Sequence, residues 1–173
     1  VSDEDPAGLM DALYKGCDVN VRDPETGDTP VMYTIRNDKR MSSYLLMDKG
    51  ADPTIPDKEG YNIIHVAAFL GNDSLLDMTL DFESAEDMDL NEYHSDGYVP
   101  MHRSCWGEET WHTQMVKYFL EQDVPHDVPV HKHAMKHPGK TCKDFTKNPD
   151  TIKLLEDWVR DNPNSGIDMW DEL

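Results

Sequence analysis

A glycine-led motif recurs along this chain at intervals close to 33 residues. Gly27 is followed by Asp-Thr-Pro-Val-Met, and Gly60, 33 residues later, is followed by Tyr-Asn-Ile-Ile-His. Gly97 opens a third copy after a further 37 residues, and Gly139 opens a fourth, weaker copy after a further 42. A unit of this length cannot bury its own apolar face, so the period predicts an array of stacked helical units.

Each of these glycines is followed by a helical pattern, a break and a second helical pattern. In the first full copy the second pattern ends at Gly50-Ala51-Asp52, and the same ending appears earlier at Gly16-Cys17-Asp18. Pro30 and Pro100 stand where the first turn of a helix tolerates proline. Glycine at a helix end takes the left-handed conformation without a Cβ penalty. The array is therefore expected to begin within a repeat.

These fragments resemble the ankyrin repeat. The residues that carry the resemblance are Thr29-Pro30, His65 to Ala68 with Gly71, Pro100 to His102, Gly50 to Asp52 and Gly16 to Asn20. The resemblance extends from about Leu9 to Trp158 and implies an all-α fold, a solenoid of about four helix–turn–helix units with protruding β-hairpin or finger loops. It also implies that His65 and His102 hold loop backbone in place and are not catalytic.

The spacing of the copies predicts how the chain is divided. We expect a single ankyrin-repeat domain over residues 1–160 and an acidic tail over residues 161–173. Within the domain the expected parts are a partial first repeat at 9–23, central repeats at 24–57, 58–93 and 94–136, and a C-terminal capping repeat at 137–160. A cap is expected because a terminal repeat otherwise leaves one apolar face uncovered.

The charge of the chain limits the classes of partner. It has 16 Lys and Arg against 35 Asp and Glu, a formal charge of −19. Nucleic acids and anionic lipid surfaces both require a basic face, so neither is expected as a partner. The longest apolar stretch, Ile63 to Leu70, is far shorter than the about 20 residues that cross a bilayer, so no membrane insertion is expected. The composition favours a protein partner with a basic surface.

The cysteines and the first residues bear on the compartment. Cys17, Cys105 and Cys142 are odd in number and widely spaced, which argues against a disulfide framework and for a reducing compartment but leaves room for one bridge. The chain starts at Val1 and lacks the features of a signal peptide, so we expect a trimmed precursor or a fragment. The expected protein is soluble and intracellular, or resident in an organelle after removal of a transit peptide, and the compartment stays undetermined.

Motifs for catalysis and for cofactor binding are missing from the sequence. It contains neither a phosphate loop nor a dinucleotide fingerprint nor a paired-carboxylate motif. Cys105 follows His102 by three residues, but without an oxyanion-binding feature beside it, so a packed, small apolar side chain is the favoured interpretation. We expect no catalytic residues, no cofactor and a non-enzymatic protein.

The segment from His126 to His137 is rich in histidine. The spacing of His131, His133 and His137 could ligate Zn²⁺, Ni²⁺ or Cu²⁺. Prolines before and after them indicate an extended insertion, and no acidic or thiol pattern fixes a coordination geometry, so a solvated loop is favoured. A metal-binding protein built on this segment is kept as an alternative function.

The resemblance indicates where a partner would bind. In ankyrin proteins the residue after the finger glycine, and the two residues before the inter-helix glycine, tend to face the concave binding surface. On this chain those positions are Asp28, Arg36, Asn37, Tyr61, Phe69, Leu70, Tyr98 and Trp106. Four aromatic residues among eight positions are typical of an interface, because large rings are costly in water and often anchor partners.

The tail offers a further attachment point. Trp170 and three aliphatic or Met side chains stand among acidic residues after the break at Asn162 to Gly166. This pattern predicts a segment that orders on a partner, with a fold-back onto the last repeat as the alternative. Taken together, the sequence predicts a protein–protein interaction module, a scaffold or a small subunit of a larger assembly. A regulatory fragment of a longer protein is a further alternative.

Overall fold

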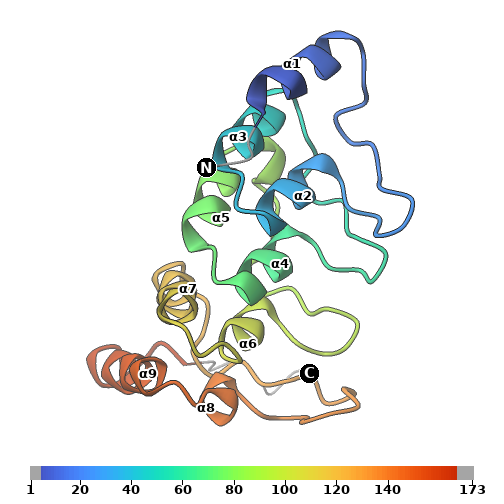
Figure 1. The fold of residues 1–173 in the computed structure, drawn as a ribbon. Helices are drawn as coiled ribbons and strands as arrows, with labels where there is room; N and C mark the ends of the chain where they lie inside the picture. Colours follow the sequence, from blue (N-terminus) through green and yellow to red (C-terminus); the bar gives the residue numbers. More distant parts are fainter. Residues whose placement is uncertain (1–4, 167–173) are drawn as a thin grey trace. The chain divides into compact units, whose positions relative to one another are not determined.

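The computed structural model describes residues 5–166, and every regular element in that range is helical (Figure 1). The elements are α1 (Pro6–Tyr14), α2 (Pro30–Arg36), α3 (Arg40–Asp48), α4 (Ile63–Leu70), α5 (Asp73–Leu80), η1 (Glu83–Ala85), α6 (Pro100–Ser104), α7 (Thr110–Glu121), α8 (Cys142–Phe145) and α9 (Pro149–Asp161). The predicted all-α fold of helix–turn–helix units is confirmed. Within the described range, every helix is too short or too polar to cross a membrane.

The helices begin where the sequence supplies a cap. Thr29 precedes Pro30 at the start of α2, and its side chain accepts a hydrogen bond from the backbone N–H of Met32. Asn62 takes this role for α4, because its side-chain oxygen accepts bonds of 3.1 Å from the backbone N–H groups of Ile64 and His65. Side chains of this kind satisfy N–H groups that have no partner within the helix.

The chain forms two compact units. Unit 1 comprises residues 1–67 and 74–89, and unit 2 comprises residues 68–73 and 90–173. Helices α1 to α3 and most of α5 belong to unit 1, α6 to α9 belong to unit 2, and α4 has its last three residues in unit 2. This division passes through the predicted 58–93 repeat. The repeat boundaries themselves stay a prediction.

The core of unit 1 is built on α3. Both α1 and α2 pack against this helix, so that three helices contribute to one apolar cluster. The buried members of the cluster are Val31, Leu46, Met47 and Ala51, and Leu9, Leu13, Val19 and Phe82 pack against them partly buried. The ring of Phe82 meets the ring of Tyr44 edge-on at a centroid distance of 5.5 Å, which fixes the start of the acidic segment that follows α5.

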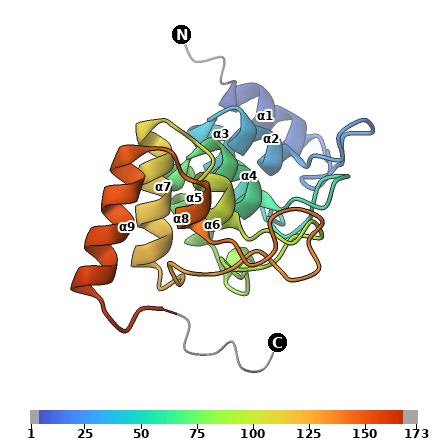
Figure 2. The same cartoon turned by 90° about the horizontal axis from the view of Figure 1, so that it is seen from below.

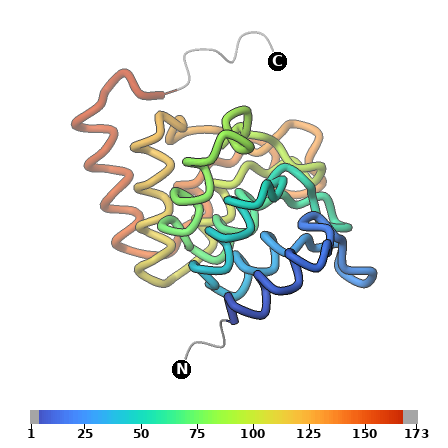
Figure 3. The backbone as a smooth tube through the Cα atoms, turned by 90° about the horizontal axis from the view of Figure 1, so that it is seen from above, coloured from blue at the N-terminus to red at the C-terminus, as the bar shows by residue number. Residues whose placement is uncertain are grey.

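The core of unit 2 is built on α7. This long helix contacts α6 and α9, and α6 also contacts α8. Helices α7 and α9 run side by side in two views, in yellow and in red (Figures 2 and 3). The buried side chains of α7 are Met115, Val116, Phe119 and Leu120. Leu155 of α9 is buried as well.

A disulfide joins two helices of unit 2. Cys105 directly follows α6, Cys142 is the first residue of α8, and their Cα atoms are 5.5 Å apart. This separation lies within the usual range for a disulfide. The expectation that Cys105 is simply a packed side chain is thus incomplete, since Cys105 is buried but covalently bonded. Cys17 is free and exposed.

Candidate protein-interaction surface

The two glycine-led turns of unit 1 are closed and joined by hydrogen bonds. The ends of the turn from Asp23 to Asp28 are bonded through backbone atoms at 2.9 Å, and those of the turn from Asp57 to Tyr61 at 3.0 Å. The backbone N–H of Lys58 donates to the oxygen of Thr26 at 3.0 Å, which links one turn to the next. These turns are the finger loops that the sequence predicts.

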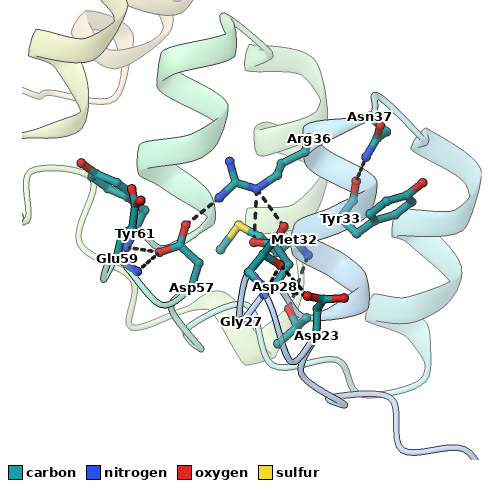
Figure 4. Close-up of polar contacts among 12 residues, drawn as sticks. Asp23, Gly27, Asp28, Met32, Tyr33, Arg36, Asn37, Asp57, Glu59 and Tyr61 are labelled. Atoms are coloured by element: carbon teal, nitrogen blue, oxygen red, sulfur yellow. Dashed lines mark hydrogen bonds and ion pairs between the residues drawn. The ribbon is translucent and has the colours of Figure 1, made fainter.

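Arg36 connects the same two turns through its side chain (Figure 4). Its Nε atom lies 3.0 Å from Asp28 Oδ2, and its Nη2 atom lies 2.6 Å from Asp57 Oδ2. The other oxygen of Asp57 accepts bonds from the backbone N–H groups of Glu59 and Tyr61. Both carboxylates are largely buried, whereas the Arg36 side chain is 38% exposed. We call Asp28, Arg36 and Asp57 the finger clamp.

The finger clamp changes the interpretation of two predicted partner residues, Asp28 and Arg36. Asp28 and Arg36 lie near the surface, but their charged groups are already engaged with each other and with Asp57. The side-chain amide of Asn37 donates to the backbone oxygen of Tyr33 at 2.8 Å. Tyr61 is half-buried, with its ring 6.2 Å from that of His65. The structure therefore gives Asp28 and Arg36 a role in holding the finger loops.

Unit 2 contains a comparable ion pair at its own glycine-led turn. Asp96 accepts two bonds from Arg103, at 3.1 and 3.0 Å, and lies 2.9 Å from Nδ1 of His94. Partial burial alone would raise the pKa of Asp96, but hydrogen bonds from His94 and Arg103 outweigh it and hold that pKa below its usual value. The guanidinium of Arg103 also lies 5.6 Å from the ring of Trp106, a cation–π contact.

The prediction that Tyr98 faces a partner is wrong. Tyr98 is only 7% exposed, and its hydroxyl lies 3.2 Å from the backbone oxygen of Lys136 and 3.1 Å from Nδ1 of His137. Its ring meets those of Trp106 and Phe145 at centroid distances of 5.1 and 6.0 Å. The long connection after α7 folds back over this ring, and the inserted residues that form it are the reason that the family position is covered here.

Four large apolar side chains of unit 2 stay exposed in one region. Phe69 is 58% exposed, Trp111 49%, Trp106 39% and Leu70 37%. We call these four residues the aromatic patch. Phe69, Leu70 and Trp106 occupy predicted partner positions, and the structure leaves all three on the surface.

His112 ties the members of the aromatic patch to one another. Its Nε2 atom lies 3.1 Å from the backbone oxygen of Phe69. A Cβ atom on Gly107, next to Trp106, would clash with the His112 ring, and a Cβ atom on Gly71, next to Leu70, would clash with the ring of Trp111. Glycine at these two positions permits the close approach, so the patch is held by backbone contacts rather than by loose side chains.

Trp111 was missed by the sequence analysis. The predicted anchors all occupy fixed positions relative to the finger and inter-helix glycines, whereas Trp111 lies beyond the inter-helix glycine, at the start of α7. The extra residues between α6 and α7 bring it beside Gly71. The tryptophan itself is visible in the sequence. Its position does not match any of the partner-facing positions of the family, so the resemblance gave no reason to select it.

The three histidines named as alternative metal ligands are not brought together in one cluster within the described residues. Among residues 5–166, no group of three or more His, Cys, Asp or Glu side chains is arranged to hold a metal ion. His131 packs edge-on against the ring of Tyr93, and His137 packs against Phe145, with ring centroids 5.4 and 5.5 Å apart respectively. His133 is exposed, with its ring 5.2 Å from that of His131. His131 and His137 thus contact different aromatic rings. Trp170, the last predicted partner residue, lies outside the described residues.

Comparison with known proteins agrees with this architecture. A family model described as ankyrin repeats, in three copies, matches residues 2–81. The match includes the finger clamp, and the helix pairs of unit 2 extend the same helix–turn–helix pattern beyond it. The resemblance that the sequence analysis drew from its glycine-led motifs is confirmed.

Three fungal proteins share parts of this chain. Palmitoyltransferase akr1 of Neurospora crassa is 35% identical over 60 residues, which are 35% of this chain and 8% of that protein. Palmitoyltransferase AKR1 of Kluyveromyces lactis is 32% identical over 81 residues, which are 46% of this chain and 11% of that protein. Ankyrin repeat domain-containing protein SAT10 of Stachybotrys chartarum is 34% identical over 88 residues, which are 51% of this chain and 4% of that protein. The chain thus spans about a tenth or less of the length of these relatives.

Proposed function

We propose that this chain is a non-enzymatic protein-interaction module that serves as a scaffold or as a small subunit of a larger assembly. The observation that carries the proposal is the aromatic patch: Phe69, Leu70, Trp106 and Trp111 stand exposed around one fixed histidine. Aromatic side chains that lose water on contact are the usual anchors of protein interfaces. The ankyrin architecture supports the proposal because arrays of this kind present extended binding surfaces.

The patch is suited to binding because it is held in place before a partner arrives. The carbonyl of Phe69 is fixed by His112, and Trp111 lies against the backbone at Gly71. A surface that is already ordered loses little conformational entropy on association. If no partner covered this surface, the same exposed rings would favour non-specific association, because large exposed apolar patches promote it.

The partner that we propose has a basic surface. Acidic side chains outnumber basic ones in both units, but the excess is concentrated in unit 1, with 17 acidic and 7 basic side chains among its described residues. The described part of unit 2 has 13 acidic and 9 basic side chains. A field of one sign steers an oppositely charged partner and is screened by salt. We therefore expect the association rate to fall as ionic strength rises.

The relatives inform the proposal only in part. Two of them are named palmitoyltransferases, but this chain matches small parts of them, and an architecture alone does not transfer an activity. A regulatory or recognition segment of a longer protein is the second candidate, and the partial coverage of all three relatives favours it. Identification of the complete gene product from the native source tests this candidate directly.

The aromatic patch is tested by a double substitution. Phe69→Ala with Trp111→Ala removes two exposed rings, and we expect co-purification of the partner from the native source, quantified by mass spectrometry, to fall at least tenfold. Tyr14→Ala is the matched control, because this aromatic side chain is exposed in unit 1, outside the patch. An unchanged helical signal in circular dichroism checks the fold. Equal recovery of the same partner by the double variant and the control would contradict the proposal.

The metal-binding alternative has its own test. Titration of Zn²⁺ into the chain, followed by calorimetry, is expected to give no site of sub-micromolar affinity that depends on His131, because that side chain packs against Tyr93. A tight site that His131→Ala abolishes would favour the metal-binding function instead.

A further inference from the structure

We propose that the aromatic patch binds an arginine-bearing peptide segment of the partner protein, with the guanidinium stacked on Trp111 and paired with Glu108 and Glu109. The inference rests on the function proposed above and names the chemistry that the partner presents. It is carried by the six residues from Trp106 to Trp111, which place two exposed glutamates between two exposed tryptophans. A guanidinium is the side-chain group that suits an aromatic face and a carboxylate together.

The two glutamates are exposed on a backbone that is held in place. The backbone oxygen of Glu108 accepts a hydrogen bond of 2.9 Å from the side-chain amide of Asn148. The backbone oxygen of Glu109 accepts one of 3.0 Å from the backbone N–H of His112. Among the described residues, neither carboxylate takes part in an ion pair or a hydrogen bond. Two negative charges therefore stand beside the patch without a cation of their own.

The start of α7 gives these glutamates little structural use. Carboxylates are favoured near a helix N-terminus, where their side chains can also accept bonds from free backbone N–H groups. Glu109 is the N-cap residue of α7, but its side chain makes no capping bond, and Glu108 lies outside the helix. Both carboxylates thus stay available to a partner.

The two tryptophans differ in how far their rings are already used. The ring of Trp106 meets those of Tyr98 and Phe145 at centroid distances of 5.1 and 6.2 Å. The guanidinium of Arg103 lies 5.6 Å from the same ring. Trp111 is 49% exposed, and within residues that the structure describes no Lys or Arg side chain lies over its ring. Trp111 is therefore the ring that can accept a cation from a partner, in the arrangement that Arg103 already forms with Trp106.

The charges next to the patch favour a cation. Lys147 and Asp150 flank Asn148, which holds the backbone of Glu108, so this neighbouring segment adds one charge of each sign. In the described part of the chain Lys147 forms no ion pair with either glutamate. The two glutamates thus decide the sign of the local field. A cationic side chain is attracted there, and an acidic one is repelled.

The combination of ring and carboxylates selects arginine. A guanidinium is planar, stacks on aromatic faces and can donate two parallel bonds to one carboxylate, whereas an ammonium is a compact and strongly hydrated point charge. Phe69 and Leu70 extend the patch beyond its charged part, and a small cation alone would leave both side chains in water. The occupant is therefore a peptide segment that carries Arg next to apolar side chains.

The probe is a phage-displayed library of random 12-residue peptides, selected on the immobilised whole chain. We expect the enriched peptides to contain Arg with an apolar residue within three positions of it. The strongest binder is then synthesised with a fluorophore, together with a version in which citrulline replaces Arg, and fluorescence anisotropy gives the Kd of each. Citrulline keeps the shape of the side chain without its charge, so at least tenfold weaker binding is expected. Failure to enrich any peptide, enriched peptides without Arg, or equal Kd values for the two versions would overturn the proposal.

Two double variants locate the arginine on the chain. Glu108→Gln with Glu109→Gln is expected to weaken binding of the Arg peptide at least tenfold and to leave the citrulline peptide unaffected, because both changes delete the same contact. Glu83→Gln with Glu86→Gln makes the same change of charge at exposed positions of unit 1 and is expected to alter binding less than twofold. Equal weakening by both double variants would show that the field of the whole chain attracts the peptide, and it would overturn the proposal.

The stacking on Trp111 has a separate test. Trp111→Phe keeps an aromatic ring that attracts cations less strongly, so the Arg peptide should lose several-fold more affinity than the citrulline peptide. Equal losses would contradict the stacking. Unchanged circular dichroism spectra check the fold of each variant.

Failure of this inference is distinguishable from failure of the proposed function. If the glutamate variant binds the Arg peptide as the native chain does while Phe69→Ala with Trp111→Ala still loses the native partner, the arginine site is refuted and the interaction patch stands. If that aromatic double variant retains the native partner, the proposed function fails, and this inference fails with it.

Discussion

The Nε2 atom of His102 lies 2.8 Å from the backbone oxygen of Val128 and donates its proton to it. The other ring nitrogen, Nδ1, accepts a bond of 3.2 Å from the backbone N–H of Val99. One neutral imidazole thereby ties the start of α6 to the connection that follows α7. The expected structural role of this histidine is confirmed, and the bond that Nδ1 accepts requires the neutral ring.

The stability of the chain is expected to fall in acid because of His102. Burial lowers its pKa to about 4 against 6.5 in the unfolded chain, so below pH 6.5 the unfolded state takes up a proton that the folded state refuses. The contribution is fully present above pH 6.5 and is lost as the pH falls toward 4, up to about 3 kcal/mol. Urea denaturation at pH 7 and pH 4.5 measures the loss, which should be smaller in His102→Gln. His133→Gln, an exposed control, should lose as much as the native chain, and identical losses in all three would contradict the prediction.

Tyr98 is expected to contribute to stability rather than directly to binding. Tyr98→Ala removes a buried ring that contacts Trp106 and Phe145 and should lower the free energy of unfolding by about 3–5 kcal/mol. Tyr98→Phe keeps the ring but loses the hydroxyl contacts and should cost about 1 kcal/mol. Phe69→Ala, at an exposed ring, should change stability by less than about 0.5 kcal/mol. Chemical denaturation that ranks Tyr98→Ala with Phe69→Ala would show that Tyr98 is exposed in solution.

The finger clamp predicts that different substitutions of Arg36 lower the free energy of unfolding by different amounts. Arg36→Gln leaves two largely buried carboxylates without their cation and should destabilise unit 1 by about 1–3 kcal/mol, a range kept low because the arginine itself is partly in solvent. Arg36→Lys keeps the charge but cannot reach both carboxylates with the same geometry, so an intermediate loss is expected. Lys49→Gln, at an exposed ion pair with Asp48, is the control and should have little effect. A null result at Arg36 in thermal or urea unfolding would mean that the clamp does not hold the fingers.

The disulfide predicts which cysteine reacts. In the oxidised, folded chain, alkylation followed by mass spectrometry should label Cys17 alone, because Cys105 and Cys142 are bonded and buried. Replacing both bonded cysteines by Ala should lower the free energy of unfolding by about 2–4 kcal/mol, mainly because the unfolded chain is then less restricted. Cys17→Ala should have no such effect. Labelling of all three cysteines without a reductant would show that the bridge does not form.

Local sequence patterns were enough to predict the repeating part of this protein. Gly27, Gly60 and Gly97 mark turns, and Thr29-Pro30 and Pro100 mark helix starts, because these features depend on the conformational preferences of a few neighbouring residues. The role of His102 followed from the same local pattern through the family resemblance. The exposed positions of Phe69, Leu70 and Trp106 were predictable for the same reason, since they are set by their register within one repeat.

The features that depend on the insertions could be seen only in the folded chain. A connection of unusual length folds back over Tyr98 and buries a residue whose register had placed it on the surface. The same stretch of chain brings the start of α8 beside the end of α6, so that Cys105 meets Cys142 across 37 residues, and the extra residues before α7 bring Trp111 to Gly71. Periodicity fixes where a residue lies in its own repeat, but an inserted loop has no period, and its path is set by which apolar surface it can cover.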